Sequence, residues 1–332
     1  MVRISADSTC DLSPALLQEY GIGVVPLYII KDDQSLRDGI DIVPQDIFDH
    51  VEKTGKLLTT SAVGIEDYVE VFAKMTSDGS EVVHVNIGSE FSACHQNALT
   101  AAKEVGGVYP VDSRNLSSGS GHIAIEAAKL AQAGKSGSEI QKEMTKLAER
   151  VETSFVIERL DYLRKGGRCS AVQALGANLL HLKPCIEVRD GKMAVGKRYR
   201  GSFEKALREY VVDRLRARTD IAPERAFVTH SGCEPELVEM VKSAAQECFR
   251  FEKLLVNRAV NRRQPWKTGS RPSAAMRRTS SIGCANPLMR RAPMGIALVL
   301  TISDDMIAAG ASTSCGWAMS HRRLARLTAW PM

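Results

Sequence analysis

The first 150 residues alternate between short apolar runs and longer stretches in which apolar residues recur every three or four positions. Nearly continuous apolar runs are typical of buried parallel strands, and they occur at 2–6, 21–30, 81–87 and 107–111. Three-to-four spacing predicts amphipathic helices, here at 43–53, 65–74, 94–102 and 121–133. This alternation predicts an α/β domain with a mostly parallel sheet.

The same patterns continue to about residue 257. They predict helices at 137–154, 202–217 and 234–249, and strands at 153–157, 225–231 and 252–257. Asp190-Gly191 is a two-residue turn signal, which predicts a hairpin over 183–200. We therefore expect two α/β domains, residues 1–150 and 151–257.

The pattern is lost near residue 258. Residues 258–332 carry twelve Lys and Arg against two acidic residues, whereas residues 1–257 have a net charge of −5. One interpretation is a frameshifted or otherwise replaced C-terminus, with 258–332 a disordered or non-native tail. The other is a genuine basic arm that binds nucleic acid or anionic lipid. The apolar run within 287–301 is consistent with one strand or with an exposed, sticky segment.

Composition places the chain among soluble globular proteins, since 44% of its residues are hydrophobic and 25% are charged. No apolar run reaches the roughly 18 residues that a membrane span needs, and the polar N-terminus does not resemble a signal peptide. The eight Cys are scattered without a C-x-x-C pair, which favours reduced thiols over a metal site or disulfides. We expect a cytoplasmic protein with no metal.

Hydroxyl and carboxylate side chains follow several of the expected strands. In an open parallel sheet, ligands bind outside the carboxyl ends of the strands, and hydroxyls with helix N-termini suit a carboxylate or a phosphate. Each of these residues could also be a simple helix cap. The clusters are Asp7-Ser8, Thr59-Thr60-Ser61, Ser89 with Ser92, and Asp112-Ser113.

A further cationic segment lies at 160–170, L-D-Y-L-R-K-G-G-R-C-S. It starts with a helix-compatible pattern and breaks at Gly166-Gly167, a pair that readily adopts positive φ. Arg164, Lys165 and Arg168 surround the break. The segment is either an anion-binding turn or an ordinary helix C-cap with solvated cations.

Six motifs occur in an order and spacing that resemble the DegV family of bacterial fatty-acid-binding proteins. The resemblance covers roughly residues 2–257. The motifs are D-S-T-C-D-L at 7–12, T-S at 60–61, G-S-E-F-S-A-C-H-Q-N-A at 88–98, V-D-S-R-N-L-S-S-G at 111–119, L-D-Y-L-R-K-G-G-R at 160–168 and L-L-H-L-K-P-C-I-E-V-R-D-G-K at 179–192.

The resemblance implies a two-domain protein that binds one long-chain fatty acid in a tunnel between its domains. Such a protein holds the acid for a dihydroxyacetone-kinase-like fatty acid kinase subunit, and the acyl phosphate feeds phospholipid synthesis. It implies no cofactor besides the bound fatty acid, no specific nucleic acid partner and no catalytic residue in this chain.

The family's carboxylate-holding residues match Thr60 and Ser92, with Ser61 beside them, and the Arg of its G-G-R turn matches Arg168. A basic segment matches Arg198 and Arg200, which we expect on a surface that faces the kinase. Four further residues are expected to line the pocket: Asp7, Ser8, Cys94 and His95.

The sequence departs from the family pattern in three motifs. Ser61-Ala62 replaces an S-Q pair, and Ser92-Ala93-Cys94-His95 replaces S-G-T-Y, which removes a hydroxyl and adds an imidazole. The family's final S-x-H-x-G-P-G motif, whose His helps close the carboxylate site, is absent, and only Ser320-His321 is reminiscent of it. We therefore expect an altered pocket lining and a carboxylate site without the family's closing motif.

An enzyme that acts on an acyl or phosphorylated small molecule in the same crevice is the alternative, with His95, Asp7 or Asp112 in a catalytic role. Such an enzyme needs a nucleophile and base or a phosphate loop. The chain contains no G-x-S-x-G, P-loop or G-x-G-x-x-G motif. The sequence therefore favours the carrier.

Overall fold

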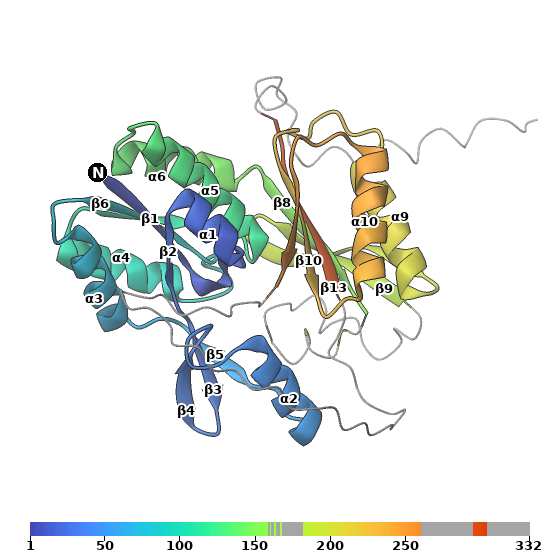
Figure 1. Cartoon of the computed structure of the whole chain (residues 1–332), viewed down its shortest axis with the longest axis horizontal. Helices are drawn as coiled ribbons and strands as arrows, with labels where there is room; N and C mark the ends of the chain where they lie inside the picture. The colour runs from blue at the N-terminus through green and yellow to red at the C-terminus, as the bar shows by residue number, and fades with distance from the viewer. Residues whose placement is uncertain (159, 161–162, 164–166, 168–181, 260–294, 304–332) are drawn as a thin grey trace, which may run out of the picture.

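The computed structural model describes residues 1–158, 160, 163, 167, 182–259 and 295–303. It consists of two α/β domains side by side, with a small unit below the first (Figure 1). The elements are β1 (Val2–Asp7), η1 (Ser8–Cys10), α1 (Pro14–Tyr20), β2 (Ile22–Val25), β3 (Tyr28–Lys31), β4 (Gln34–Arg37), α2 (Pro44–Thr54), β5 (Thr59–Ser61), α3 (Ile65–Thr76), β6 (Glu81–Asn86), α4 (Cys94–Val105), β7 (Val108–Asp112), α5 (Ser118–Gln132), α6 (Gly137–Ala148), β8 (Val151–Ile157), β9 (Leu182–Arg189), β10 (Lys192–Arg200), α9 (Phe203–Leu215), β11 (Ala226–Ser231), α10 (Pro235–Cys248), β12 (Leu254–Arg258) and β13 (Gly295–Thr301).

The first domain is built on a parallel sheet with strand order β2-β1-β6-β7, which confirms the α/β expectation. Helices α5 and α6 cover one face, where Ile4 and Val83 lie in a core with Ile123 and Ile140. Helices α3 and α4 cover the other face. Because successive strand residues point to opposite faces, the polar Asp7, His84 and Asn86 lie on the α3–α4 side.

Local chemistry fixes the helix ends of this domain. The hydroxyl of Ser13 accepts a hydrogen bond from the backbone N–H of Leu16 at 3.3 Å, and Pro14 occupies the first turn of α1. Gly21 ends that helix with a φ of +64°, a conformation that costs glycine little. Both ends of α1 are therefore set by residues within or next to the helix itself.

The apolar run at 21–30 forms two strands rather than the single strand expected. Pro26, which has no backbone N–H to donate to a ladder, separates β2 in the parallel sheet from β3 in a small antiparallel sheet of order β4-β3-β5. Thr59–Ser61 is itself strand β5 of that small sheet. Its expected place at the carboxyl end of a parallel strand is therefore wrong. Helix α2 completes this small unit.

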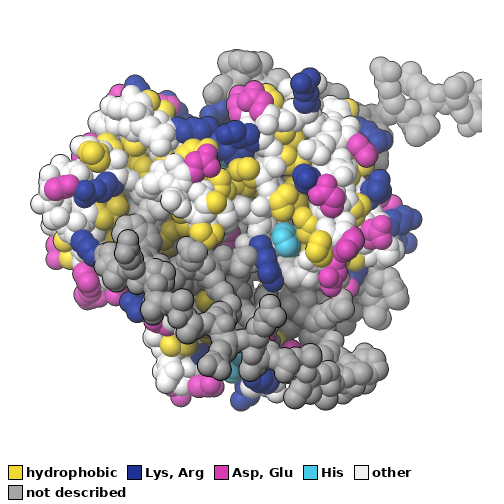
Figure 2. All heavy atoms as spheres, in the orientation of Figure 1, with side chains coloured by type: hydrophobic (Ala, Val, Ile, Leu, Met, Phe, Trp, Pro, Cys, Tyr) yellow, Lys and Arg dark blue, Asp and Glu magenta, His cyan; other side chains and the backbone are white. Residues whose placement is uncertain are grey.

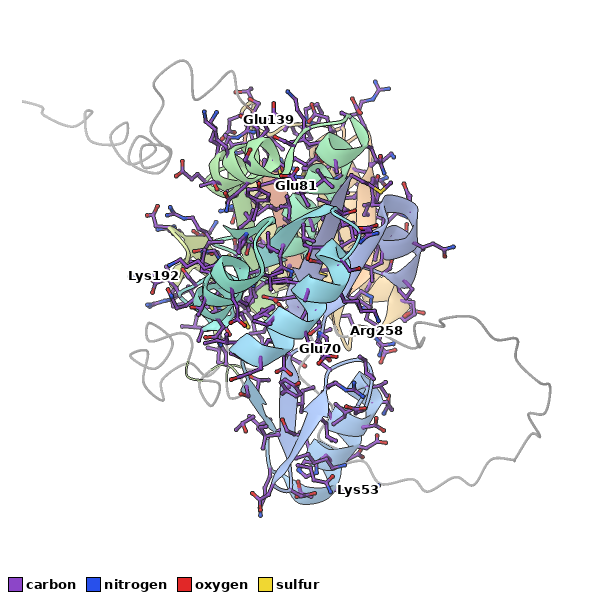
Figure 3. All side chains as sticks on the ribbon, turned by 90° about the vertical axis from the view of Figure 1, so that its left-hand side faces the viewer. Lys53, Glu70, Glu81, Glu139, Lys192 and Arg258 are labelled. Atoms are coloured by element: carbon purple, nitrogen blue, oxygen red, sulfur yellow. The ribbon has the colours of Figure 1, made fainter. Side chains whose placement is uncertain are left out.

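The second domain has a six-stranded sheet of order β10-β9-β8-β13-β11-β12, in which only β11 and β12 pair in parallel. Helices α9 and α10 pack on one face of it around Leu207, Tyr210 and Val241. The outer strands β10 and β12 carry Lys192 and Arg258, which lie on opposite sides of the molecule in Figure 3. The hairpin expected at Asp190-Gly191 joins β9 to β10.

Strand β13 shows which of the two possibilities for the apolar run within 287–301 holds, since this run forms a strand and not an exposed segment. It pairs antiparallel with β8 on one side and β11 on the other, in the middle of the sheet. Ile296, Leu298 and Leu300 are each 1% exposed. An apolar run with partners on both sides satisfies its backbone groups and buries its side chains. The second domain thus extends beyond residue 257, while 260–294 and 304–332 lie outside the described residues.

One face of α5 joins the two domains through hydrogen bonds. Ser118, His122 and Glu126 are four residues apart and so share a helix face. The Ser118 hydroxyl lies 2.6 Å from that of Thr229, and His122 Nε2 lies 2.8 Å from Thr301 Oγ1. Arg225 donates to Glu126 at 2.8 Å. Lys and Arg side chains also gather at the surface where the domains meet (Figure 2). The domains therefore meet through polar as well as apolar contacts.

His122 makes this interface sensitive to acid. Burial lowers the pKa of His122 to about 4, and the nearby Arg225 guanidinium adds to the effect. The unfolded chain binds a proton below about pH 6.5 and the folded chain does not, so stability falls as the pH drops from about 6.5 towards 4. Urea unfolding at pH 7 and pH 5 should show a loss of about 2 kcal/mol from this residue.

The variant His122→Gln should lose less stability over the same pH interval. The matched control His50→Gln, on α2, should keep the full wild-type difference. An equal pH dependence in His122→Gln and wild type would contradict the assignment.

Candidate functional site

The carboxylate of Asp7 lies at the end of β1 and is 1% exposed. Oδ1 accepts hydrogen bonds from the Tyr68 hydroxyl at 2.6 Å and from His84 Nε2 at 3.1 Å, and Oδ2 accepts the backbone N–H of Ile87 at 2.8 Å. A buried carboxylate is tolerated only when donors of this kind surround it. Asp7 thus connects α3, through Tyr68, to the end of β6.

Asn86 extends this network to the first turn of α4. Its side-chain nitrogen donates to Asp7 Oδ2 at 3.3 Å and to the Tyr68 oxygen at 3.1 Å. The amide oxygen therefore points the other way and lies 3.2 Å from His95 Nδ1. Since that oxygen can only accept, Nδ1 carries the hydrogen. Burial lowers the pKa of His95 below its usual 6.5, so the ring is neutral at pH 7.

Ser92 and Cys94 lie where the chain enters α4. The Ser92 hydroxyl accepts the backbone N–H of Cys94 at 3.3 Å and lies 3.1 Å from the Cys94 sulfur. Cys94 is fully buried in the core cluster that also holds Tyr68 and Val63. Burial raises the pKa of the Cys94 thiol, and a neighbouring Asp7 charge adds to the effect. A buried neutral thiol is a poor nucleophile. The role of Cys94 is therefore packing beside the site and not chemistry.

Thr60 and Ser61 lie in the small unit, in a segment that leads to α3. Both are exposed on β5. Two residues further on, the carbonyl oxygen of Val63 accepts a hydrogen bond from Asn97 Nδ2 at 2.7 Å, which ties this segment to α4. The structure therefore connects the Thr60–Ser61 segment to the helix that begins after Ser92, with no hydrogen bond between the Thr60 and Ser92 side chains among the described contacts.

Ser8 and Asp112 hold loops around the site. The Ser8 hydroxyl donates to Asp38 at 2.6 Å and accepts the N–H of Leu27 at 3.1 Å, which attaches the small unit to the end of β1. Asp112 accepts from the backbone and hydroxyl of Ser89 at 3.1 and 2.5 Å. These contacts give both residues a role in positioning the loops.

Cationic residues were expected at two places, Arg168 at the site and Arg198 with Arg200 on the surface that faces a partner. Arg168 lies outside the described residues, as do Arg164, Lys165 and Gly166, whereas Gly167 has the positive φ, +71°, expected of the glycine pair. Arg198 and Arg200 are exposed on the edge strand β10. At the tip of that hairpin, Lys192 pairs with Glu90 across the domains at 3.4 Å.

Three residues of the network, Tyr68, His84 and Asn86, were not among the site residues expected from the sequence. The signal was the run V-V-H-V-N within β6, in which His84 and Asn86 interrupt a buried apolar strand at a spacing of two. Residues two apart share a face of the sheet, so this pair marked a polar face. Tyr68 had no comparable signal, because an aromatic residue on an amphipathic helix usually belongs to the core.

The described residues show neither a metal-binding cluster nor a membrane-spanning helix. They hold no group of three or more His, Cys, Asp or Glu side chains arranged to bind a metal ion. Within the same part of the chain, none of the helices has the length and apolar character required to span a membrane.

Sequence comparisons match most of this chain to one protein family. The family model "Uncharacterised protein, DegV family" matches residues 1–259. A DegV domain-containing protein of Clostridium acetobutylicum is 34% identical over 207 residues, which cover 62% of this chain and 74% of the relative. One from Caldanaerobacter subterraneus subsp. tengcongensis is 30% identical over 249 residues, covering 74% and 88%.

Solved structures show the same fold. A structure titled "Fatty Acid Binding of a DegV family Protein from Thermus thermophilus" has a TM-score of 0.71 and 25% identity, and the match covers 91% of this chain and 99% of that one. DegV from Bacillus subtilis, described as a fatty acid binding protein, has a TM-score of 0.67 and 22% identity, with 90% and 99% covered. The two-domain architecture therefore follows that of these neighbours.

Proposed function

Because this chain belongs to the DegV family, we propose that it binds a long-chain fatty acid and holds its carboxylate at the first turn of α4. The observation that carries the proposal is the match to the Thermus thermophilus fatty-acid-binding structure over nearly the whole of both chains. The residues of the expected carboxylate site support it, since Ser92 and His95 lie together at that turn and the Thr60–Ser61 segment is tied to it.

The physical chemistry of such a ligand agrees with these residues. Burial of an acyl chain contributes about 0.8 kcal/mol per CH₂, so a sixteen-carbon chain supplies about 12 kcal/mol before ordering costs. The carboxylate loses its hydrogen bonds to water when it is buried, so the protein must supply hydrogen-bond donors in their place. The hydroxyls of Thr60 and Ser92 provide neutral donors, and Arg168 would add a charge.

We further propose that the bound acid is presented to a dihydroxyacetone-kinase-like kinase subunit, which phosphorylates the carboxylate. The chain itself would then act as a carrier and not as an enzyme. The exposed Arg198 and Arg200 on β10 are suited to an acidic partner surface. Acyl phosphate formed only when such a kinase and ATP are added to the loaded protein would support this step, and turnover by the chain alone would contradict it.

The variant Ser92→Ala is expected to retain less fatty acid, because a donor to the carboxylate is lost. Loss of one hydrogen bond to a charged group costs about 1.5–3 kcal/mol, or about a tenfold to hundredfold weaker affinity. Native mass spectrometry of the purified protein, with identification of the extracted lipid, measures this occupancy.

Ser138→Ala, an exposed serine on α6, is the matched control and should keep wild-type occupancy. Unchanged occupancy in Ser92→Ala would remove Ser92 from the site. A wild-type protein that neither carries nor takes up a fatty acid would refute the proposed function itself.

A further inference from the structure

The His95 ring has one nitrogen committed to the protein. Asn86 holds Nδ1 as a donor, because the Asn86 amide nitrogen is already directed to Asp7 and Tyr68. The other nitrogen, Nε2, lies on the opposite edge of the ring and has no hydrogen-bond partner among the described residues. In a neutral ring with hydrogen on Nδ1, Nε2 presents a lone pair and can only accept.

This arrangement conflicts with an anionic ligand unless a proton is added. A carboxylate has only acceptor oxygens, so it repels the Nε2 lone pair of a neutral imidazole. The conflict is removed when one proton lies between Nε2 and a carboxylate oxygen. The contact is then a charge-assisted hydrogen bond, which is stronger than a neutral one.

Resting on the function proposed above, we propose that His95 makes binding of the acid proton-coupled: the carboxylate enters together with one proton, which is held at Nε2. This goes beyond fatty acid binding because it assigns a linkage between pH and lipid affinity.

The groups around His95 favour this behaviour. Burial lowers the pKa of the free ring, so the proton is absent before the ligand binds, and His84 on β6 acts in the same direction. The carboxylates of Asp112 on β7 and Asp7 on β1 oppose this and stabilise an imidazolium once it forms. A ligand carboxylate next to Nε2 would add a third negative charge and raise the pKa of His95 further.

The affinity for the fatty acid should therefore decrease as the pH rises. The complex holds one proton more than its separated components, so affinity falls as the pH rises through the interval between the free and the bound pKa of His95. The steepest fall is about tenfold per pH unit. A site built from Thr and Ser hydroxyls alone would show no such slope above the pKa of the acid.

Isothermal titration calorimetry with palmitate delivered from cyclodextrin tests the proposal. At pH 7, titrations in buffers with different ionisation enthalpies count the protons taken up on binding. The wild type should take up close to one proton more than His95→Gln, whose side chain does not titrate. His50→Gln, a histidine variant remote from α4, should match the wild type.

A second measurement does not depend on a variant. The imidazole ¹⁵N shifts of His95 should change from a neutral ring protonated at Nδ1 to an imidazolium when palmitate is added. Palmitate binding with equal proton uptake in wild type and His95→Gln, or with a ring that stays neutral, would overturn the proposal and leave lipid binding intact. Absence of palmitate binding in the wild type would instead refute the proposed function on which it rests.

Discussion

Replacement of Leu298 by alanine is expected to lower the free energy of unfolding by about 2–5 kcal/mol. Leu298 lies in the central strand β13, is 1% exposed, and packs with Tyr210, Val228 and Val241 between the sheet and helices α9 and α10. Truncation leaves a cavity between two sheet neighbours and the helices, which cannot close it without moving. Urea unfolding of the purified chain measures the loss.

Val256→Ala is the matched control for this variant. Val256 lies in the edge strand β12 of the same sheet but is 41% exposed, so its truncation should change stability by about 0.5 kcal/mol or less. Equal effects of the two substitutions would show that residues 295–301 are not part of the core. That outcome would restore the interpretation in which everything after residue 257 is a tail.

Asp7→Asn is expected to cost about 3 kcal/mol or more and also to reduce lipid occupancy. The new amide nitrogen has the shape of the lost oxygen but is a donor, and it faces the donors of Tyr68, His84 or Ile87. A buried donor without an acceptor costs about 1–3 kcal/mol, and more than one is affected. The disturbance passes through Asn86 to His95.

Glu70→Gln makes the same carboxylate-to-amide change on the exposed surface of α3, where Figure 3 labels Glu70. It should leave both unfolding and lipid occupancy unchanged. Circular dichroism with urea measures stability, and native mass spectrometry measures occupancy. If Asp7→Asn behaved as Glu70→Gln does, the Asp7 network would not organise the site.

The elements of the first domain were predictable because their signals are local. The Ser13 cap, Pro14 in the first turn and Gly21 with positive φ all act within one helix. The division of 21–30 into β2 and β3 had a local signal as well, since Pro26 interrupts the run. Their assignment to two different sheets had none, because strand pairing depends on residues far away in the chain.

The candidate site was predictable to a similar degree. Ser92, Cys94 and His95 lie at the start of α4, where the motif placed them, because a strand-to-helix turn is a local feature. The closeness of Thr60 to Ser92 stays a prediction, because it depends on how the small unit packs against the first domain. The hydrogen bonds of Asn97 and Ser8 attach that unit to the first domain. The hydrogen on His95 Nδ1 depends on Asn86, whose own orientation is set by Asp7 and Tyr68 from two other elements.

The sequence by itself determined the α/β class, the family and the motif residues around the start of α4. Only the tertiary structure decided that the apolar run at 295–301 pairs with β8 and β11, and that Asp7 organises Tyr68, His84 and Asn86. The reason is physical: periodicity records which side chains must be buried, whereas the partners that bury and hydrogen-bond them come from distant parts of the chain.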